Sequence, residues 1–218
     1  GLVGSEMCIR DSPVGAFRYI AKYPQIKSLI VCIFLINVAA HAVQSTWSYY
    51  TMERYAWNER MVGISMGFIG VLLAIVQAGL LRIIIPKLGL PKSIVIGLSL
   101  YVISFPLMAF SSEPWMLFAA SVPFVFAGIA GPAMQSFISN HTPNNEQGQI
   151  QGGITSIVSL TAIFGPPLMS NIFAFFTNHK HSAYFPGAPF MMASVLSLIA
   201  VSIAALYFNK KEEPATES

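Results

Sequence analysis

The sequence predicts an all-α integral membrane protein, built as a bundle of six transmembrane helices. Hydrophobic residues make up 55% of the 218 residues and charged residues only 10%, whereas a soluble domain carries about 25% charged residues. Six apolar stretches each reach the roughly 20 residues that a helix needs to cross a hydrocarbon core. They are continuous rather than alternating in polarity, which favours helices over the strands of a barrel. The predicted spans are residues 26–50, 61–85, 93–110, 115–139, 149–177 and 187–208.

The two ends of the chain differ in character from the spans. Residues 1–12 (GLVGSEMCIRDS) resemble a translated sequencing adapter, and we expect them to be non-native and to lie outside the fold. Residues 13–25 combine aromatic and aliphatic side chains with Arg18 and Lys22, which indicates an amphipathic lead-in on the cytoplasmic side. Residues 209–218 are short and charged, which predicts a disordered cytoplasmic tail.

The distribution of Lys and Arg predicts that both termini face the cytoplasm. With the N-terminus inside, nine of the 12 basic residues fall on the inner side and three on the outer side. The inner ones are Arg10, Arg18, Lys22, Lys27, Arg82, Lys87, Lys92, Lys210 and Lys211, and the outer ones are Arg54, Arg60 and Lys180. Short loops set membrane orientation by this bias. Because the basic residues form no cluster, we expect no nucleic-acid partner.

Aromatic residues gather at the ends of several spans. Those near the end of the first span are Trp47, Tyr49, Tyr50, Tyr55 and Trp57, while Trp115 opens the fourth span and Tyr207 closes the sixth. We expect these side chains to anchor the helices at the lipid–water interface. The second span carries Gly63, Gly67 and Gly70, a small-residue face that allows another helix to approach closely.

Prolines inside three of the later spans predict kinks, because each removes a backbone donor and clashes with the preceding turn. They are Pro106, Pro123, Pro132 and the Gly165-Pro166-Pro167 run. We expect Gly165 and Pro166 to mark a helix bend. Kinked helices are typical of spans that move during a working cycle, although packing alone also explains them.

Polar side chains divide the spans into two groups. In the first span Asn37, His41 and Gln44 share roughly a quarter of the helix circumference. The second, fourth and fifth spans also carry Gln or Thr, whereas the third and sixth contain no Asn, Gln or His. Because polar groups are costly in lipid, we expect four spans to wall a polar pathway and two to face lipid. The cavity candidates are Asn37, His41, Gln44, Gln77, Gln135 and Thr155.

Each cavity candidate has an alternative reading as a packing residue. The ordinary pKa of His, about 6.5, suits proton handling, but a buried neutral His41 bonded to a neighbouring helix explains the position too. Gln44, Gln77 and Gln135 could bind substrate or join helices. No span centre holds Asp, Glu, Lys or Arg, and no catalytic motif or metal-type Cys spacing occurs. We therefore expect no enzyme, no cofactor and no bound metal.

The segment 139–152, SNHTPNNEQGQIQG, carries the resemblance to a known family. It is similar to the cytoplasmic loop between helices ten and eleven of major facilitator transporters, especially the tetracycline-efflux type of drug:proton antiporters. The matching positions are Pro143, Glu146, Gln147, Gly148, Gln151 and Gly152. Residues 57–63, 82–92 and 153–166 resemble other parts of the same family.

The resemblance implies that residues 26–208 are helices seven to twelve of a twelve-helix protein, whose missing N-terminal six-helix half is a partner. In such proteins substrate binds near the midplane between the halves, and helices seven, eight, ten and eleven line the cavity. The tetracycline-efflux branch has an acidic residue in helix nine and a histidine in helix eight; the corresponding positions here are Tyr101 and Ala74.

The function that the resemblance implies is secondary active transport of a small organic molecule by alternating access. We expect proton-coupled drug or metabolite efflux in the bacterial inner membrane, with His41 as the proton-coupling candidate. The other partners are then the lipid bilayer, the substrate and protons. Two alternatives stay open: a metabolite uptake symporter of the same superfamily, and a non-transporting membrane scaffold.

Overall fold

A computed structural model describes residues 24–178 and 184–212 of the chain. The adapter-like segment, nearly all of the lead-in and the last six residues lie outside the described part. Within it, the chain is helical and contains no strand. Six helical spans are long and apolar enough to cross a membrane, and the predicted fold class is confirmed.

The six spans follow one another as antiparallel segments with short links. They are α3 (Pro24–Tyr55), α4 (Glu59–Ile75), the π-helix η1 (Val76–Leu80), α5 (Leu81–Leu88), α6 (Leu90–Ala109), α7 (Pro114–Ala127), α8 (Ala130–Asn140), α9 (Gln147–Thr177) and α10 (Ala188–Glu212). The segments α4, η1 and α5 together form the second span, and α7 and α8 form the fourth. The last helix continues to Glu212, so residues 209–212 of the predicted tail are helical.

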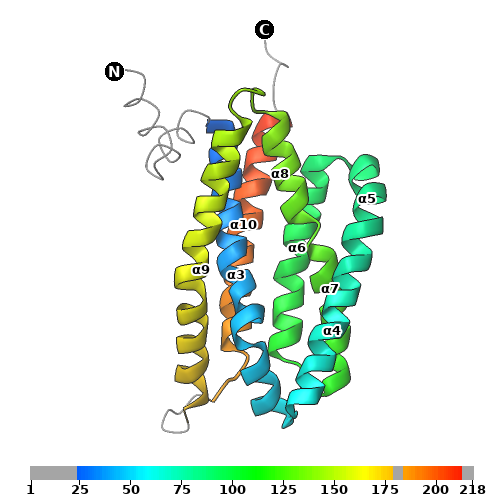
Figure 1. The fold of residues 1–218 in the computed structure, drawn as a ribbon, viewed down its shortest axis with the longest axis vertical. Coiled ribbons are helices and arrows are strands. Elements are labelled where there is room, and N and C mark those ends of the chain that lie inside the picture. Colours follow the sequence, from blue (N-terminus) through cyan, green and yellow to red (C-terminus); the bar gives the residue numbers. More distant parts are fainter. Residues whose placement is uncertain (1–23, 179–183, 213–218) are drawn as a thin grey trace, which may run out of the picture.

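The helices form a flat bundle with two open edges. Figure 1 shows α9 at one edge, α4 and α5 at the other, and α3, α10 and α6 between them. The central α10 packs along both α3 and α6, while α9 packs on α3 and α7 packs on α6. In the most apolar stretch of each helix, 50% of the residues of α3 are buried, but only 17% in α4 and 22% in α9. The two edge helices therefore present most of their surface outward.

The bundle has two ends, one of which we name by a link that it contains. The start of α3, the α5–α6 link, the α8–α9 turn and the end of α10 lie together at the α8–α9 end (Figure 1). The α3–α4 and α6–α7 links lie at the opposite end, together with the end of α9 and the start of α10. The Lys27, Lys87 and Lys92 side chains are exposed at the α8–α9 end, the end that the sequence predicts to be cytoplasmic.

Two of the predicted interface anchors instead belong to the core. Trp47 is 1% exposed and Tyr50 is fully buried, because α3 continues as a helix to Tyr55 and turns this stretch inward. The indole Nε1 of Trp47 donates to Ser65 Oγ at 2.9 Å, which satisfies its polar atom inside the bundle. The anchor prediction is wrong for these two residues, whereas Tyr49 and Trp115 are 59% and 67% exposed.

One of the predicted proline kinks is a break in the helix. In the fourth span α7 ends at Ala127 and α8 begins at Ala130. The break therefore includes Gly128, the residue four positions before Pro132, whose carbonyl a regular helix would leave without a donor. Pro132 cannot donate to the Gly128 carbonyl, and its ring would clash there. Gly128 N and Ile129 N instead donate to Val125 O and Phe126 O, three residues back, at 3.1 and 3.2 Å.

The other prolines lie in unbroken helices. The helices α6, α7 and α9 continue through Pro106, Pro123 and the pair Pro166-Pro167. No interruption of α9 marks the expected bend at Gly165 and Pro166, and the bend stays a prediction.

Candidate transport surface

The polar face of α3 changes from buried to exposed along the helix. Asn37 is half-buried, and its amide Nδ2 donates to Ile33 O of the same helix at 2.8 Å. His41 is 9% exposed, and Gln44, one turn further on, is exposed. The face therefore lies along the border between the packed interior and the open surface of the bundle.

His41 packs directly against Gly165 of α9. A Cβ atom added to Gly165 would overlap the imidazole ring, at 2.6 Å from Cγ and 3.0 Å from Cβ of His41. Gly165 is itself buried. The structure thus brings together the proton-coupling candidate and the candidate bend, two sites that lie 124 residues apart in the sequence.

The second span, which carries the cavity candidate Gln77, contains a π-helical turn that is not predicted from its sequence. Gln77 lies within η1, a single π-helical turn in which Leu81 N bonds to Val76 O, five residues back. Gln77 is exposed, as is most of α4. Turns of this kind insert an extra residue per turn and are frequent at functional sites. The sequence of this turn, VQAGL, gives no sign of a π-helix, because one Gln and one Gly in an apolar run are also compatible with a regular α-helix.

The remaining candidates also lie on the outside of the described bundle. Gln135 on α8 and Thr155 on α9 are both exposed. The Thr155 hydroxyl donates to Gln151 O of its own helix at 2.9 Å. Of the six cavity candidates, His41 is buried, Asn37 is half-buried and the other four are exposed, so most of them lie on the outer surface of the described chain.

The glycine face of the second span is open. An added Cβ would meet nothing within 4 Å at Gly63, Gly67 or Gly70. None of the described helices packs against this face at close range. The expectation of a closely approaching helix is therefore untested by the described part of the chain.

The loop motif forms the tight turn between α8 and α9. The backbone N–H of Glu146 donates to Pro143 O at 2.9 Å, and Glu146 O in turn accepts from Gln149 N and Ile150 N at 3.1 and 3.2 Å. Gln147 opens α9 and donates from Nε2 to Asn144 Oδ1 at 3.3 Å. Gly148, Gln151 and Gly152 are exposed on the first turns of α9. The motif therefore shapes a helix entry at the α8–α9 end of the bundle.

The opposite end of the bundle holds a polar cluster whose two tyrosines, Tyr50 and Tyr55, are predicted from the sequence only to be interface anchors. Tyr50 OH donates to Met108 O at 2.7 Å, and Tyr55 OH lies 2.6 Å from Ser111 Oγ. Arg54 Nε donates to Ser111 O at 3.3 Å. Three side chains of α3 thus bond to the last turn of α6 and to Ser111 just after it, close to the end where a helix leaves its last C=O groups without intrahelical partners.

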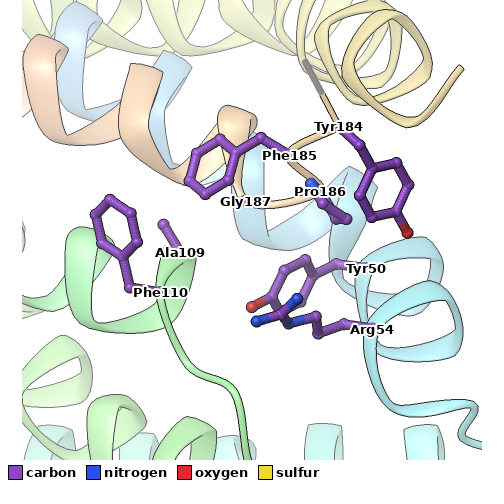
Figure 2. Close-up of a pocket in the computed structure, with 8 residues that line it drawn as sticks. All are labelled: Tyr50, Arg54, Ala109, Phe110, Tyr184, Phe185, Pro186 and Gly187. Atoms are coloured by element: carbon purple, nitrogen blue, oxygen red, sulfur yellow. The ribbon is translucent and has the colours of Figure 1, made fainter. Parts of the chain in front are cut away.

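A small cavity of about 80 Å³ lies beside this cluster. Figure 2 shows its walls: Tyr50 and Arg54 from α3, Ala109 and Phe110 from the end of α6, and the segment 184–187 before α10. The Tyr184 hydroxyl donates to Glu53 Oε1 at 2.7 Å, and this hydrogen bond raises the pKa of Tyr184 above its usual value. Ligand sites for drug-sized molecules enclose about 300–1,000 Å³, so this cavity by itself does not hold such a molecule.

Among the residues that the structure describes, no three His, Cys, Asp or Glu side chains form a group that could hold a metal ion. The polar side chains of the surface are amides, hydroxyls and one imidazole. Such groups can bind a small organic molecule by hydrogen bonds or exchange a proton.

Comparisons with known proteins identify the family. Residues 29–218 match the Major Facilitator Superfamily. The chain is 28% identical over 163 residues to the class C tetracycline resistance protein of Escherichia coli, covering 75% of this chain and 41% of that protein. It is 30% identical over 155 residues to the class B tetracycline resistance protein of Escherichia coli, covering 71% and 39%.

Two further comparisons extend the similarity beyond bacteria. The chain is 26% identical over 199 residues to the Hippocampus abundant transcript 1 protein of Homo sapiens, covering 81% of this chain and 41% of that protein. The crystal structure of the human organic anion transporter MFSD10 (TETRAN) shares the fold, with a TM-score of 0.78 and 19% identity, over 93% of this chain and 48% of that one.

The fold and the comparisons define an integral membrane protein of the transporter class. The chain belongs to the Major Facilitator Superfamily, and its curated relatives include tetracycline resistance proteins. It spans about two fifths of the length of those relatives.

Proposed function

We propose that the chain supplies the C-terminal six-helix half of a proton-coupled exporter of small organic molecules, which works by alternating access. The observation that carries the proposal is the exposure of Gln44, Gln77, Gln135 and Thr155 on four apolar helices of a transporter family member. Polar side chains on lipid-facing surfaces are costly, so they belong in a water-filled pathway or against protein. A second six-helix half placed over these residues would enclose such a pathway.

The names of the relatives support export of an organic compound. Several are tetracycline resistance proteins. The substitution of Tyr101 and Ala74 for the acidic and histidine positions of that branch argues against the same metal–drug chemistry. The ring centroids of Tyr101 and Phe105 lie 5.7 Å apart, and both rings contact Phe124 in an aromatic cluster packed between α6 and α7. We therefore propose an organic substrate that binds without a metal ion.

The membrane placement follows from the same proposal. Both termini would face the cytoplasm of a bacterial inner membrane, with the α8–α9 end inside. Alternating access would then rock this bundle against the other half about the midplane, where transporters of this kind hold their substrate.

A transport assay tests the proposal. Everted membrane vesicles that contain the product of the complete reading frame should accumulate ethidium or tetracycline when a proton gradient is imposed, and a protonophore should abolish the accumulation. The double variant His41→Leu/Gln135→Leu should lose most of it. The control Ser202→Leu changes an exposed hydroxyl on α10 that bonds only its own helix and should retain it.

Three results would count against the proposal. Substrate movement in the same direction as the protons would indicate an uptake symporter. Undiminished accumulation in the double variant would remove His41 and Gln135 from the pathway. The absence of proton-driven movement for a panel of organic cations, anions and neutral compounds would favour a scaffold.

A further inference from the structure

The contact between α3 and α9 has an unusual chemical composition. The ring of His41 occupies the space that a side chain at position 165 would need, so only glycine fits opposite it. The edge of the ring that meets Gly165 is the Cδ2 edge, since Cδ2 is the atom nearest to the added Cβ. Because the imidazole lies against the backbone of α9, helices α3 and α9 of the proposed pathway are in close contact at this point.

The other edge of the ring holds a buried nitrogen. His41 Nδ1 is buried and has no hydrogen-bond partner in the described part of the chain. A neutral imidazole carries its proton on one nitrogen only. An N–H without an acceptor costs more than a lone pair without a donor would in such an apolar place, so the geometry favours the tautomer with the proton on Nε2.

A proton added to His41 would therefore have to go to Nδ1. It would come from a hydronium ion in the pathway, which leaves as water, and the product would be an imidazolium whose Nδ1–H points at no acceptor. Burying such a charge without a partner is costly. The charged ring would be stabilised only if it moved to an acceptor or to water, and either movement removes it from Gly165.

Among the residues that the structure describes, no charged side chain near His41 offers that acceptor in the packed arrangement. Helices α8 and α9 carry no Asp, Glu, Lys, Arg or His. The charged residues of α4 are Glu59 and Arg60, which lie in its first turn. The titratable residues of α10 lie in its last turns and are Tyr207, Lys210, Lys211 and Glu212. On α3 itself Lys27, Glu53 and Arg54 lie near the helix ends, and Cys32 and Tyr50 are each nine residues away.

We infer that His41 and Gly165 form a proton-sensitive contact, in which the neutral ring holds α3 against α9 and the protonated ring releases it. The inference rests on the proposed function. His41 and Gly165 are positioning residues, and proton binding to His41 would change how α3 and α9 pack. Gly165 acts by leaving room for the ring. The adjacent Pro166 and Pro167 remove two backbone donors from the same stretch of α9, which weakens the helix where the contact lies.

The experiment measures the α3–α9 distance as a function of pH in the complete transporter. Spin labels would be placed at the exposed positions 52 and 175 through Met52→Cys and Phe175→Cys, in a background from which Cys32 and every other cysteine has been removed, in lipid nanodiscs. The same samples labelled with ¹⁵N-histidine would report the tautomer and titration of His41, assigned by comparison with His41→Gln. Ethidium transport in liposomes would be followed separately.

The inference predicts four results. His41 should be the Nε2–H tautomer at high pH, and the distance distribution should change at the pH where His41 titrates. His41→Gln should abolish that change. Gly165→Ala should move the change to higher pH, because the added methyl group destabilises the neutral packed arrangement. The control Gly131→Ala, where an added Cβ meets nothing within 4 Å, should leave the change where it is.

Two results would overturn the inference: a pH-dependent distance change that persists in His41→Gln, or a His41 that titrates while the distance stays constant. If Gly165→Ala fails to fold, His41→Gln and the histidine spectra still decide between these outcomes. A wild-type protein that shows the pH response but moves no substrate would contradict the proposed function and leave the contact standing. A wild-type protein that moves substrate but shows no pH response would contradict the proposed His41–Gly165 contact and leave the proposed function standing.

Discussion

Several polar residues of the candidate surface satisfy their own hydrogen bonds within one helix. Asn37 donates to Ile33 O and Thr155 to Gln151 O, each four residues back. Such bonds lower the cost of a polar side chain in lipid. They make Asn37 and Thr155 weaker indicators of a pathway than Gln44, Gln77 and Gln135, whose exposed amides make no hydrogen bond within the described part of the chain.

At the residue scale, the best-defined energetic prediction concerns Tyr50. Its hydroxyl is fully buried and donates to Met108 O at 2.7 Å. Tyr50→Phe should lower the stability of the protein by about 0.5–1.5 kcal/mol, the usual net contribution of an intramolecular hydrogen bond. The midpoint of thermal unfolding in detergent measures the loss.

Tyr49→Phe is the matched control for that substitution. Tyr49 is the preceding residue on α3 but is 59% exposed, so its hydroxyl should contribute little. Equal unfolding midpoints for Tyr50→Phe and the wild type would show that the α3–α6 hydrogen bonds do not stabilise the bundle.

At the scale of single elements, the broken helix and the continuous helices differ in the residue that lies four positions before the proline. Gly128 precedes Pro132, whereas Ala119 precedes Pro123 and Ala162 precedes Pro166. Glycine leaves a helix at little cost, but alanine favours it. The break between α7 and α8 therefore falls where a missing donor coincides with a weak helix former.

Pro132→Ala should restore a donor to Gly128 O and join α7 to α8 as one helix. The distance between spin labels at the exposed positions 115 and 140 should then change and its distribution should narrow. Pro123→Ala is the control, because α7 is already continuous through Pro123. An unchanged distribution in Pro132→Ala would assign the break to packing around Gly128 instead.

At the scale of the whole molecule, the two least buried helices are the two edges of the bundle. Both α4 and α9 expose large apolar side chains, including Val71 at 61% and Ile163 at 65%. Polar and glycine positions lie on the same helices, which suits a surface that meets lipid on one side and a second protein half on the other. The length of the matched relatives is consistent with such a partner.

We expect the described chain by itself to insert into membranes and to transport nothing. Coexpression with the remaining part of the reading frame as a separate polypeptide should restore ethidium efflux. Cellular accumulation of ethidium, with each part expressed alone as a control, measures this. Efflux by the chain alone would contradict the two-half architecture.

The membrane environment, the all-α fold class and the number of spans could be predicted from the sequence, because apolar length is a local property that a bilayer selects directly. The loop at residues 139–152 indicated the family for the same reason, since its residues are contiguous. The contacts of Tyr50 with α6 and of His41 with Gly165 emerge only in the folded bundle. Their partners lie 58 and 124 residues away, and no periodicity within one helix specifies which neighbouring helix will pack against it.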